Sequence, residues 1–129
     1  MSPRILLIED NEQNRYLTTY LLEQHGFEVV SAENGRLGIE LAAQQSFDLI
    51  LLDMQLPIMD GYSVARELRL DRDLKKIPIV AVTSYAMAGD RERILAAGCD
   101  GYMEKPINPD TFVADIGRHL SRSKGQEIA

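Results

Sequence analysis

Three runs of four aliphatic residues, each followed by a polar residue, constrain the fold of this 129-residue chain most strongly. They cover residues 5–8, 49–52 and 79–82, and segments with helical periodicity separate them. An unbroken apolar run of this length, bounded by turn-forming residues, is typical of a strand buried on both faces. Two shorter segments, Val29-Val30 and Tyr102-Met103, bring the number of expected strand–helix alternations to five.

Regular alternation of strand and helix predicts an α/β fold with a parallel sheet, helices on both faces and right-handed crossovers. For a doubly wound (βα)5 chain the expected strand order is 2-1-3-4-5, with a switch point between the first and third strands. A closed eight-stranded barrel would need about twice this length. We predict one domain over residues 1–121 and a disordered or frayed C-terminal tail over residues 122–129.

The helical segments carry apolar residues at helical spacing, which predicts the side of each helix that faces the sheet. These residues are Tyr16, Leu17, Tyr20 and Leu21 in the first helix, Leu37, Leu41 and Ala42 in the second, Val64, Ala65 and Leu68 in the third, and Phe112, Val113, Ile116 and Leu120 in the last. The charged run over residues 69–76 is expected to be a solvated loop after the third helix.

The charge balance and the single cysteine narrow the setting in which the protein works. Twenty acidic residues against 14 basic ones give a net charge of −6, which argues against a nucleic-acid partner. Cys99 is the only cysteine, so no intrachain disulfide can form, as suits a reducing compartment. The apolar run at residues 5–8 is too short for a signal peptide or a membrane span. We predict a cytoplasmic protein without a membrane partner.

Polar residues follow four of the five expected strands, and the carboxyl ends of parallel strands meet at one edge of a sheet. These residues are Glu9-Asp10, Asp53, Thr83-Ser84 and Lys105. Each has an ordinary explanation by itself, respectively a solvated pair, a turn cap, a turn hydroxyl and a surface cation. Ordinary explanations for all four at the same edge are together much less plausible.

Three carboxylates at one edge need cations to remain ionised together. Two carboxylates about 5 Å apart repel by roughly 3 kcal/mol at an effective dielectric near 20. Lys105 supplies one positive charge, and an oxygen-rich acidic cluster suits Mg²⁺. Asp53 is then available as a nucleophile, with Thr83 as a hydrogen-bond donor to a phosphoryl oxygen. The pattern favours phosphoryl transfer that forms an acyl phosphate on Asp53.

At these positions the chain resembles the receiver domains of bacterial two-component response regulators, which have a flavodoxin-like fold. The motifs that carry the resemblance are Glu9-Asp10, Asp53 with Pro57 and Asp60-Gly61, Thr83, and Lys105-Pro106. The resemblance implies that Asp53 accepts a phosphoryl group from a phosphohistidine on a sensor kinase or phosphotransfer protein. It also implies that Mg²⁺, or Mn²⁺, binds to Asp10, Asp53 and the Gln55 carbonyl, and to Glu9 through water. Many receivers have Asp where this chain has Glu9.

The same resemblance implies a conformational switch and two contact surfaces. Thr83 would move toward the phosphoryl group, and Tyr102 would move from an exposed to a buried position. The Lys105–Pro106 peptide would be cis, and the segment 89–97, the fifth strand and the last helix would form the output face. Kinase docking is expected near Gln13, Asn14, Leu17, Pro106 and Ile107.

Three other functions share some of these features. A phosphatase with an Asp nucleophile would resemble Asp-x-Asp, but Gln55 occupies the second position. A flavodoxin-like nucleotide or flavin binder would need a glycine-rich phosphate loop, which the sequence lacks. A degenerate receiver that only docks would lack one of Asp53, Thr83 and Lys105. No His or Cys spacing indicates zinc.

We therefore expect a signalling switch with slow autodephosphorylation rather than a turnover enzyme. The chain begins at a Met directly before the first strand, and the residues after the last helix are too few for an output domain. A stand-alone receiver is the prediction on these grounds. A receiver domain excised from a hybrid kinase would have the same sequence features.

Overall fold

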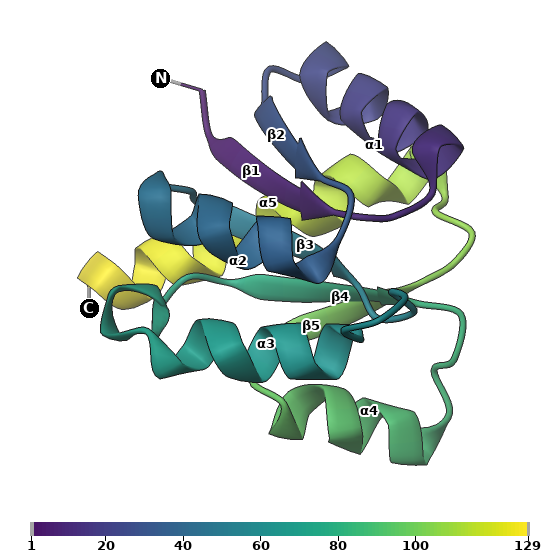
Figure 1. Ribbon diagram of the computed structural model, residues 1–129. Coiled ribbons are helices and arrows are strands. Elements are labelled where there is room, and N and C mark those ends of the chain that lie inside the picture. Colours follow the sequence, from purple (N-terminus) through teal and green to yellow (C-terminus); the bar gives the residue numbers. More distant parts are fainter. Residues whose placement is uncertain (1, 129) are drawn as a thin grey trace.

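The computed structural model describes residues 2–128, and the side chains of residues 2–120. Its five parallel strands form one sheet in the order β2-β1-β3-β4-β5, which confirms the predicted fold class and strand order (Figure 1). The strands are β1 (Arg4–Ile8), β2 (Glu28–Ala32), β3 (Leu49–Asp53), β4 (Ile79–Thr83) and β5 (Gly101–Glu104). Ile8 is in register with Leu52, and Asp53 with Val82, so the carboxyl ends of the central strands lie at one edge.

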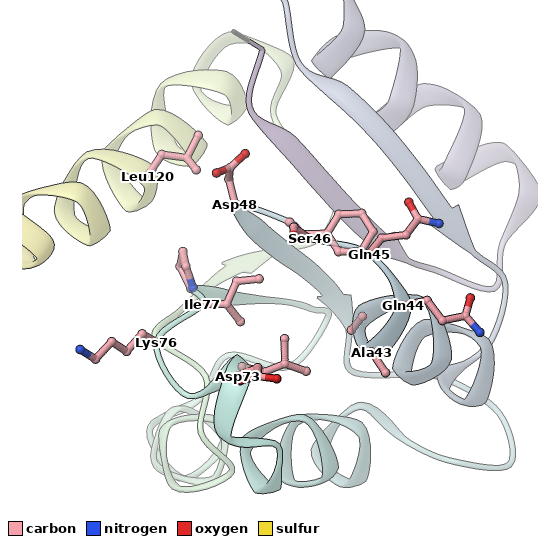
Figure 2. A pocket seen from close by; sticks show the side chains of 13 residues that line it. Ala43, Gln44, Gln45, Ser46, Asp48, Asp73, Lys76, Ile77 and Leu120 are labelled. Atoms are coloured by element: carbon pink, nitrogen blue, oxygen red, sulfur yellow. The ribbon is translucent and has the colours of Figure 1, made fainter.

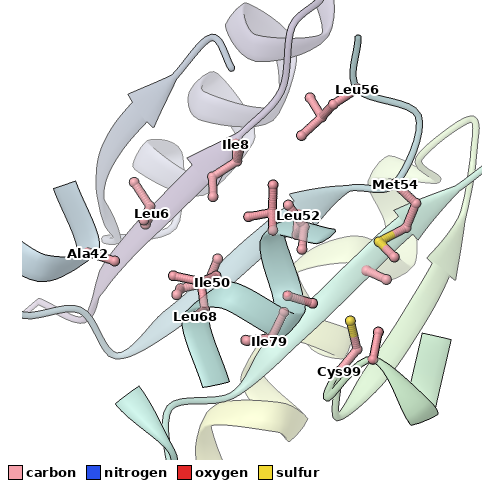
Figure 3. Close-up of a cluster of buried hydrophobic side chains, with 14 of the residues drawn as sticks. Leu6, Ile8, Ala42, Ile50, Leu52, Met54, Leu56, Leu68, Ile79 and Cys99 are labelled. Atoms are coloured by element: carbon pink, nitrogen blue, oxygen red, sulfur yellow. The ribbon is translucent and has the colours of Figure 1, made fainter. Parts of the chain in front are cut away.

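Helices cover both faces of the sheet (Figure 1). They are α1 (Glu12–Gln24), α2 (Gly35–Gln44), α3 (Gly61–Leu70), α4 (Ala88–Ala96) and α5 (Pro109–Ile128), with a short 3₁₀ helix η1 (Arg72–Leu74). Because alternate residues of a strand point to opposite faces, β3 supplies Ile50 and Leu52 to a core under α2, α3 and α4 (Figure 3). Its residues Leu49 and Leu51 belong to the core under α1 and α5.

The predicted inward sides of α1 and α2 are partly wrong. Tyr16 is 74% exposed and Tyr20 is 51% exposed, whereas α1 buries Thr18 and Leu22. Tyr16 and Tyr20 are four residues apart and share one side of α1, but this side faces solvent. Thr18 and Leu22 have the same spacing on another side of the helix, so the spacing alone does not show which side is buried. Leu17 and Leu37 are also exposed, at 46% and 36%.

The predictions for α3 and α5 are largely confirmed. Val64, Ala65 and Leu68 of α3 are buried, as are Phe112, Ile116 and Leu120 of α5, while Val113 is partly buried. The structure continues α5 to Ile128, whereas the sequence predicts a frayed tail from residue 122. The side chains after Leu120 lie outside those that the structure describes, so the domain limit at residue 121 stays a prediction.

The charged run over residues 69–76 is not simply a solvated loop, and this expectation is wrong for Arg69. The Arg69 side chain is only 18% exposed and forms an ion pair with Asp100. Its guanidinium donates hydrogen bonds to the main-chain carbonyl groups of Gly98, Leu74 and Ile77 over 2.7–2.8 Å, and to that of Lys75 over 3.2 Å. Arg69 therefore ties the end of α3 to η1, to the approach to β4 and to the α4–β5 turn.

The opposite, amino-terminal edge of the sheet carries a cavity of about 490 Å³ (Figure 2). Phe47 and Asp48, before β3, line it together with Ile77 and Pro78, before β4. This cavity is separated by the length of the strands from the acidic residues at the carboxyl edge. No helix among the described residues combines the length and the apolar character needed to cross a bilayer.

Candidate functional site

Three carboxylate side chains meet at the carboxyl edge of the sheet, as predicted. Glu9 and Asp10 follow β1 directly, and Asp53 is the last residue of β3. One oxygen from each of the three carboxylates lies within 4.8 Å of the others. Asp53 is 2% exposed and Glu9 is 5% exposed, while Asp10 is open to solvent. The cluster thus has a buried floor and one accessible carboxylate at its rim.

Two donors fix the orientation of the Asp53 carboxylate. Lys105 Nζ lies 2.8 Å from Asp53 Oδ1, and the Gln55 main-chain N–H donates to the same oxygen over 2.9 Å. Lys105 reaches this position from the segment after β5, where the Lys105–Pro106 peptide bond is cis, as the family resemblance implies. The predicted pairing of Lys105 with Asp53 is therefore present in the structure.

The pKa values of the two buried carboxyl groups move apart. Burial, together with the hydrogen bond to Asp53 and the negative charge of Asp53, raises the pKa of the Glu9 carboxyl to about 7. Burial also tends to raise the pKa of Asp53, but the hydrogen bonds from Glu9, Lys105 and the Gln55 N–H outweigh it and lower that pKa below its usual value. The two pKa shifts therefore have opposite directions, because burial dominates for Glu9 whereas hydrogen bonds to the charged form dominate for Asp53.

Thr83 is fully buried at the end of β4, and its hydroxyl is already engaged. It accepts hydrogen bonds from the Gln55 side-chain amide over 2.9 Å and from the Tyr85 N–H over 3.0 Å. The Gln55 side-chain oxygen in turn accepts from the Ser84 N–H over 3.0 Å. The Gln55 side chain therefore joins the β3 and β4 ends. This link was not predicted, because Gln55 was assigned only a main-chain carbonyl ligand and the second position of the Asp-x-Asp comparison.

The β1–α1 loop is held by its own side chains. Glu9 Oε2 accepts from the Asn11 N–H over 3.3 Å, and Asn11 caps α1 by accepting from the Asn14 N–H over 2.9 Å. Arg15 Nη1 donates to the main-chain oxygens of both Glu9 and Asp10. Arg15 was not among the predicted site residues, although a basic side chain six residues after Glu9 and five after Asp10 was a usable signal in the sequence.

Most of the residues predicted to dock a kinase lie together beside the acidic cluster. Asn14 and Leu17 of α1, with Pro106 and Ile107 after β5, line a hollow of about 280 Å³ that also includes Glu9 and Lys105. Gln13 is exposed on α1 but does not line this hollow. The structure therefore places four of the five predicted docking residues around one depression.

Tyr102, the predicted second switch residue, is half-buried on β5. The Arg91 guanidinium of α4 lies 5.6 Å from the centroid of its ring. Tyr102 also borders a hollow of about 300 Å³ between β5 and α5. Its ring thus lies against α4, and the residue borders open space beside α5.

The loop between β3 and α3 contains a strained residue close to the cluster. Ile58 has φ +67° and is fully exposed, and the Met59 N–H donates to the Pro57 carbonyl over 2.7 Å, which closes a γ-turn around it. A γ-turn with a positive φ at its central residue is rare and strained, and a residue held in such a region is unfavourable by about 1–3 kcal/mol.

We expect Ile58→Asn to raise the free energy of unfolding by about 1 kcal/mol, because Asn tolerates a positive φ far better than a β-branched residue. A chemical denaturation curve followed by circular dichroism measures the change. Ile58→Val is the matched control: it keeps the β-branched carbon and should leave the stability within about 0.5 kcal/mol. An Asn variant no more stable than the Val variant would show that φ +67° carries no cost here.

Comparison with known proteins decides the family. The model of the response regulator receiver domain matches residues 5–117, most of the chain. The chain belongs to this family. This match confirms the family that the motifs predict. Receivers of this family act in two-component signalling together with histidine kinases.

Individual relatives agree with this assignment. The chain is 41% identical over 120 residues to the polar-differentiation response regulator DivK of Brucella anthropi. This match covers 93% of this chain and 98% of DivK. A CheY-like receiver of Methanospirillum hungatei has a TM-score of 0.90 at 28% identity, over 98% of this chain and 99% of the other. The receiver of the Pseudomonas aeruginosa sensor kinase PA1611 has a TM-score of 0.83 at 37% identity, over 97% and 99%. That last structure holds a magnesium ion in its active-site cleft.

Proposed function

We propose that this receiver accepts a phosphoryl group on Asp53 from a phosphohistidine of a histidine kinase or phosphotransfer protein. The observation that carries the proposal is the Asp53 carboxylate itself. It is ionised, nearly buried and held by Lys105 and the Gln55 N–H at the edge where three carboxylates meet. In the transfer, a carboxylate oxygen of Asp53 forms a bond to phosphorus while the bond from phosphorus to the imidazole nitrogen of the donor breaks.

The donor set fits Mg²⁺. Glu9, Asp10 and Asp53 offer hard oxygen ligands within reach of one ion, and Lys105 is the cation paired with Asp53 among the described residues. We propose Asp10, Asp53 and the Gln55 carbonyl as direct ligands, with Glu9 acting through water. A bound Mg²⁺ supplies positive charge to the phosphoryl oxygens. Mn²⁺ takes similar oxygen ligands, and we expect it to substitute.

The remaining residues of the site have separate roles in this proposal. Lys105 offsets charge on the transferred group, and the Thr83 hydroxyl bonds a phosphoryl oxygen after it leaves its present partner Tyr85. Tyr102 then moves inward beside α4, and the face formed by α4, β5 and α5 contacts a downstream protein. The hollow lined by Leu17 and Pro106 receives the phosphodonor, and exposed Gln13 on α1 contacts it outside the hollow.

The proposal describes a switch in the cytoplasm that signals through protein contact, without nucleic-acid or membrane binding and without catalytic turnover. Gln55 supports the last point, because it occupies the position where a phosphatase of the Asp-x-Asp type has its second acid. Its side-chain amide is bound to Thr83 and Ser84 and has no ionisable proton to exchange.

Phosphorylation by a small donor tests the proposal directly. With Mg²⁺ and acetyl phosphate, the intact mass of the wild-type protein should rise by about 80 Da, the mass of one phosphoryl group. Asp53→Asn should show no gain, and EDTA should suppress the gain in the wild type. An Asp10→Asn variant distinguishes loss of a metal ligand from loss of the acceptor. A high Mg²⁺ concentration should restore part of the labelling in Asp10→Asn but none in Asp53→Asn. A wild-type protein that gains no mass would contradict the proposal.

We also expect the phosphorylated state to last for minutes rather than seconds. We propose that the bulky Gln55 and Tyr85 side chains shield the acyl phosphate from water, and the Gln55 side chain is fixed by two hydrogen bonds. The decay of the phosphorylated mass after removal of acetyl phosphate measures the half-life. Gln55→Gly should shorten it, whereas a wild-type half-life of seconds would contradict the shielding.

A further inference from the structure

Arg15 connects the first turn of α1 to the two acidic residues that follow β1. Its Nη1 atom donates to the Glu9 main-chain oxygen over 3.0 Å and to the Asp10 main-chain oxygen over 2.9 Å. We propose that Arg15 is a positioning residue for the metal site, because it holds the two consecutive peptide groups from which the Glu9 and Asp10 carboxylates project. The inference rests on the proposed function, since it concerns Mg²⁺ bound at Glu9, Asp10 and Asp53.

The acidic pair lies in a short segment that regular structure does not hold. The Glu9 N–H bonds to Ala32 of β2 over 3.0 Å and makes the last ladder contact of β1, and α1 begins only at Glu12. The Asn11 cap fixes the start of the helix. Between these two anchors, Arg15 holds the main-chain oxygens of Glu9 and Asp10, and the other bond in this segment is that of Glu9 Oε2 with the Asn11 N–H over 3.3 Å.

Mg²⁺ is sensitive to such orientation. It demands near-ideal octahedral geometry with ligand distances of about 2.0–2.1 Å. Loss of groups that orient metal ligands typically lowers metal affinity about 10- to 100-fold. We therefore expect Arg15→Ala to raise the Mg²⁺ dissociation constant about tenfold.

The positive charge of Arg15 should weaken Mg²⁺ binding, whereas its positioning role should strengthen it, so variants can separate the two effects. A guanidinium near the site repels Mg²⁺, so removal of its charge alone would tighten metal binding. Arg15→Lys keeps the charge but lacks the fixed guanidinium fork, and the two residues are not interchangeable as donors. Positioning predicts weaker binding in both variants, whereas a pure charge effect predicts tighter binding in Arg15→Ala and no change in Arg15→Lys.

The experiment is an Mg²⁺ titration of the full chain followed by backbone amide NMR shifts, for wild type, Arg15→Ala and Arg15→Lys. Arg36→Ala, which removes an exposed arginine from the first turn of α2, is the charge control. Thermal unfolding in EDTA shows whether each variant is folded. The rate of labelling by acetyl phosphate, measured against Mg²⁺ concentration, gives a second readout. In the Arg15 variants the half-saturating Mg²⁺ concentration should be higher than in the wild type, and the maximal rate should be unchanged.

The measured Mg²⁺ affinities decide whether Arg15 positions the metal ligands or not. An Mg²⁺ affinity at least fivefold weaker in Arg15→Ala, and weaker by a smaller factor in Arg15→Lys, supports the positioning role. Unchanged or tighter binding in both variants overturns it, and if Arg15→Ala does not fold, Arg15→Lys alone decides in the same way. Absence of Mg²⁺ shifts in the wild type would instead contradict the proposed metal site, so the two failures are distinguishable.

Discussion

Arg69→Ala should lower the free energy of unfolding by about 3–5 kcal/mol, a large share of the roughly 5–15 kcal/mol typical of a domain. The Arg69 guanidinium donates to the carbonyl groups of Gly98, Leu74 and Ile77 and pairs with Asp100. Hydrogen bonds that involve a charged group contribute about 1.5–3 kcal/mol each, and their sum overstates the effect because they share one side chain. Truncation leaves partly buried carbonyl groups and the Asp100 carboxylate without this partner.

Urea denaturation followed by circular dichroism measures the loss, and two variants calibrate it. Arg66→Ala, one turn earlier on α3, removes an exposed arginine whose bond to Ser63 Oγ is 3.5 Å long. It should change the stability by no more than about 0.5 kcal/mol. Arg69→Lys keeps the ion pair with Asp100 but lacks the several N–H donors of the planar guanidinium. Its free energy of unfolding should lie between those of Arg66→Ala and Arg69→Ala. Equal stabilities for Arg66→Ala and Arg69→Ala would show that the network contributes nothing.

The fold was predictable because its signals are local. Each buried strand is a short aliphatic run, and regular alternation with helices restricts the connections to a parallel sheet. Only the resemblance and the usual strand order of such folds were needed to fix the topology. The C-terminal region differs, since no local signal in residues 121–128 marks the end of α5 at Ile128.

Contacts between distant segments were not predictable in the same way. Arg69 stands in a run of charged residues, and its partners Gly98 and Asp100 lie about 30 positions later. Tyr16 and Tyr20 show the converse case, because helical spacing identifies a side of α1 but not which side faces the sheet. Composition cannot separate an apolar side that packs internally from one that faces outward.

The site was predictable in its residue types and less so in its bonding. Parallel strands necessarily bring Glu9, Asp53 and Lys105 to one edge, and simple electrostatics predicts that their charges interact. The sequence does not show in which direction the pKa of each carboxyl group moves, since that depends on the different surroundings of Glu9 and Asp53. It also does not show that the Gln55 amide bonds to Thr83.

Gly61→Ala should reduce labelling of Asp53 by acetyl phosphate about 100-fold, if Asp53 is the acceptor as proposed. Gly61 begins α3 where that helix meets the end of β3. A Cβ atom at this position would lie 2.5 Å from Met54 Cα and 2.7 Å from the Asp53 main-chain oxygen. Both are main-chain atoms, so the start of α3 and the end of β3 must move apart, and we expect this movement to displace the Asp53 carboxylate relative to Lys105. A displacement of about 1 Å suffices for a rate loss of this size.

The same substitution should cost about 1–3 kcal/mol of stability through overpacking, which remains compatible with folding. Gly117→Ala is the matched control, because a Cβ atom there meets nothing within 4 Å among the described residues, apart from its chain neighbours and the backbone of its own helix. Within α5 it should raise the stability by up to about 1 kcal/mol and leave labelling unchanged, since Ala is the better helix former. Labelling rates are compared by intact mass at saturating Mg²⁺, and the Lys105–Asp53 contact is followed by the Lys105 side-chain NMR signal. If Gly61→Ala were labelled at the wild-type rate, close packing of α3 against β3 would not be what positions Asp53.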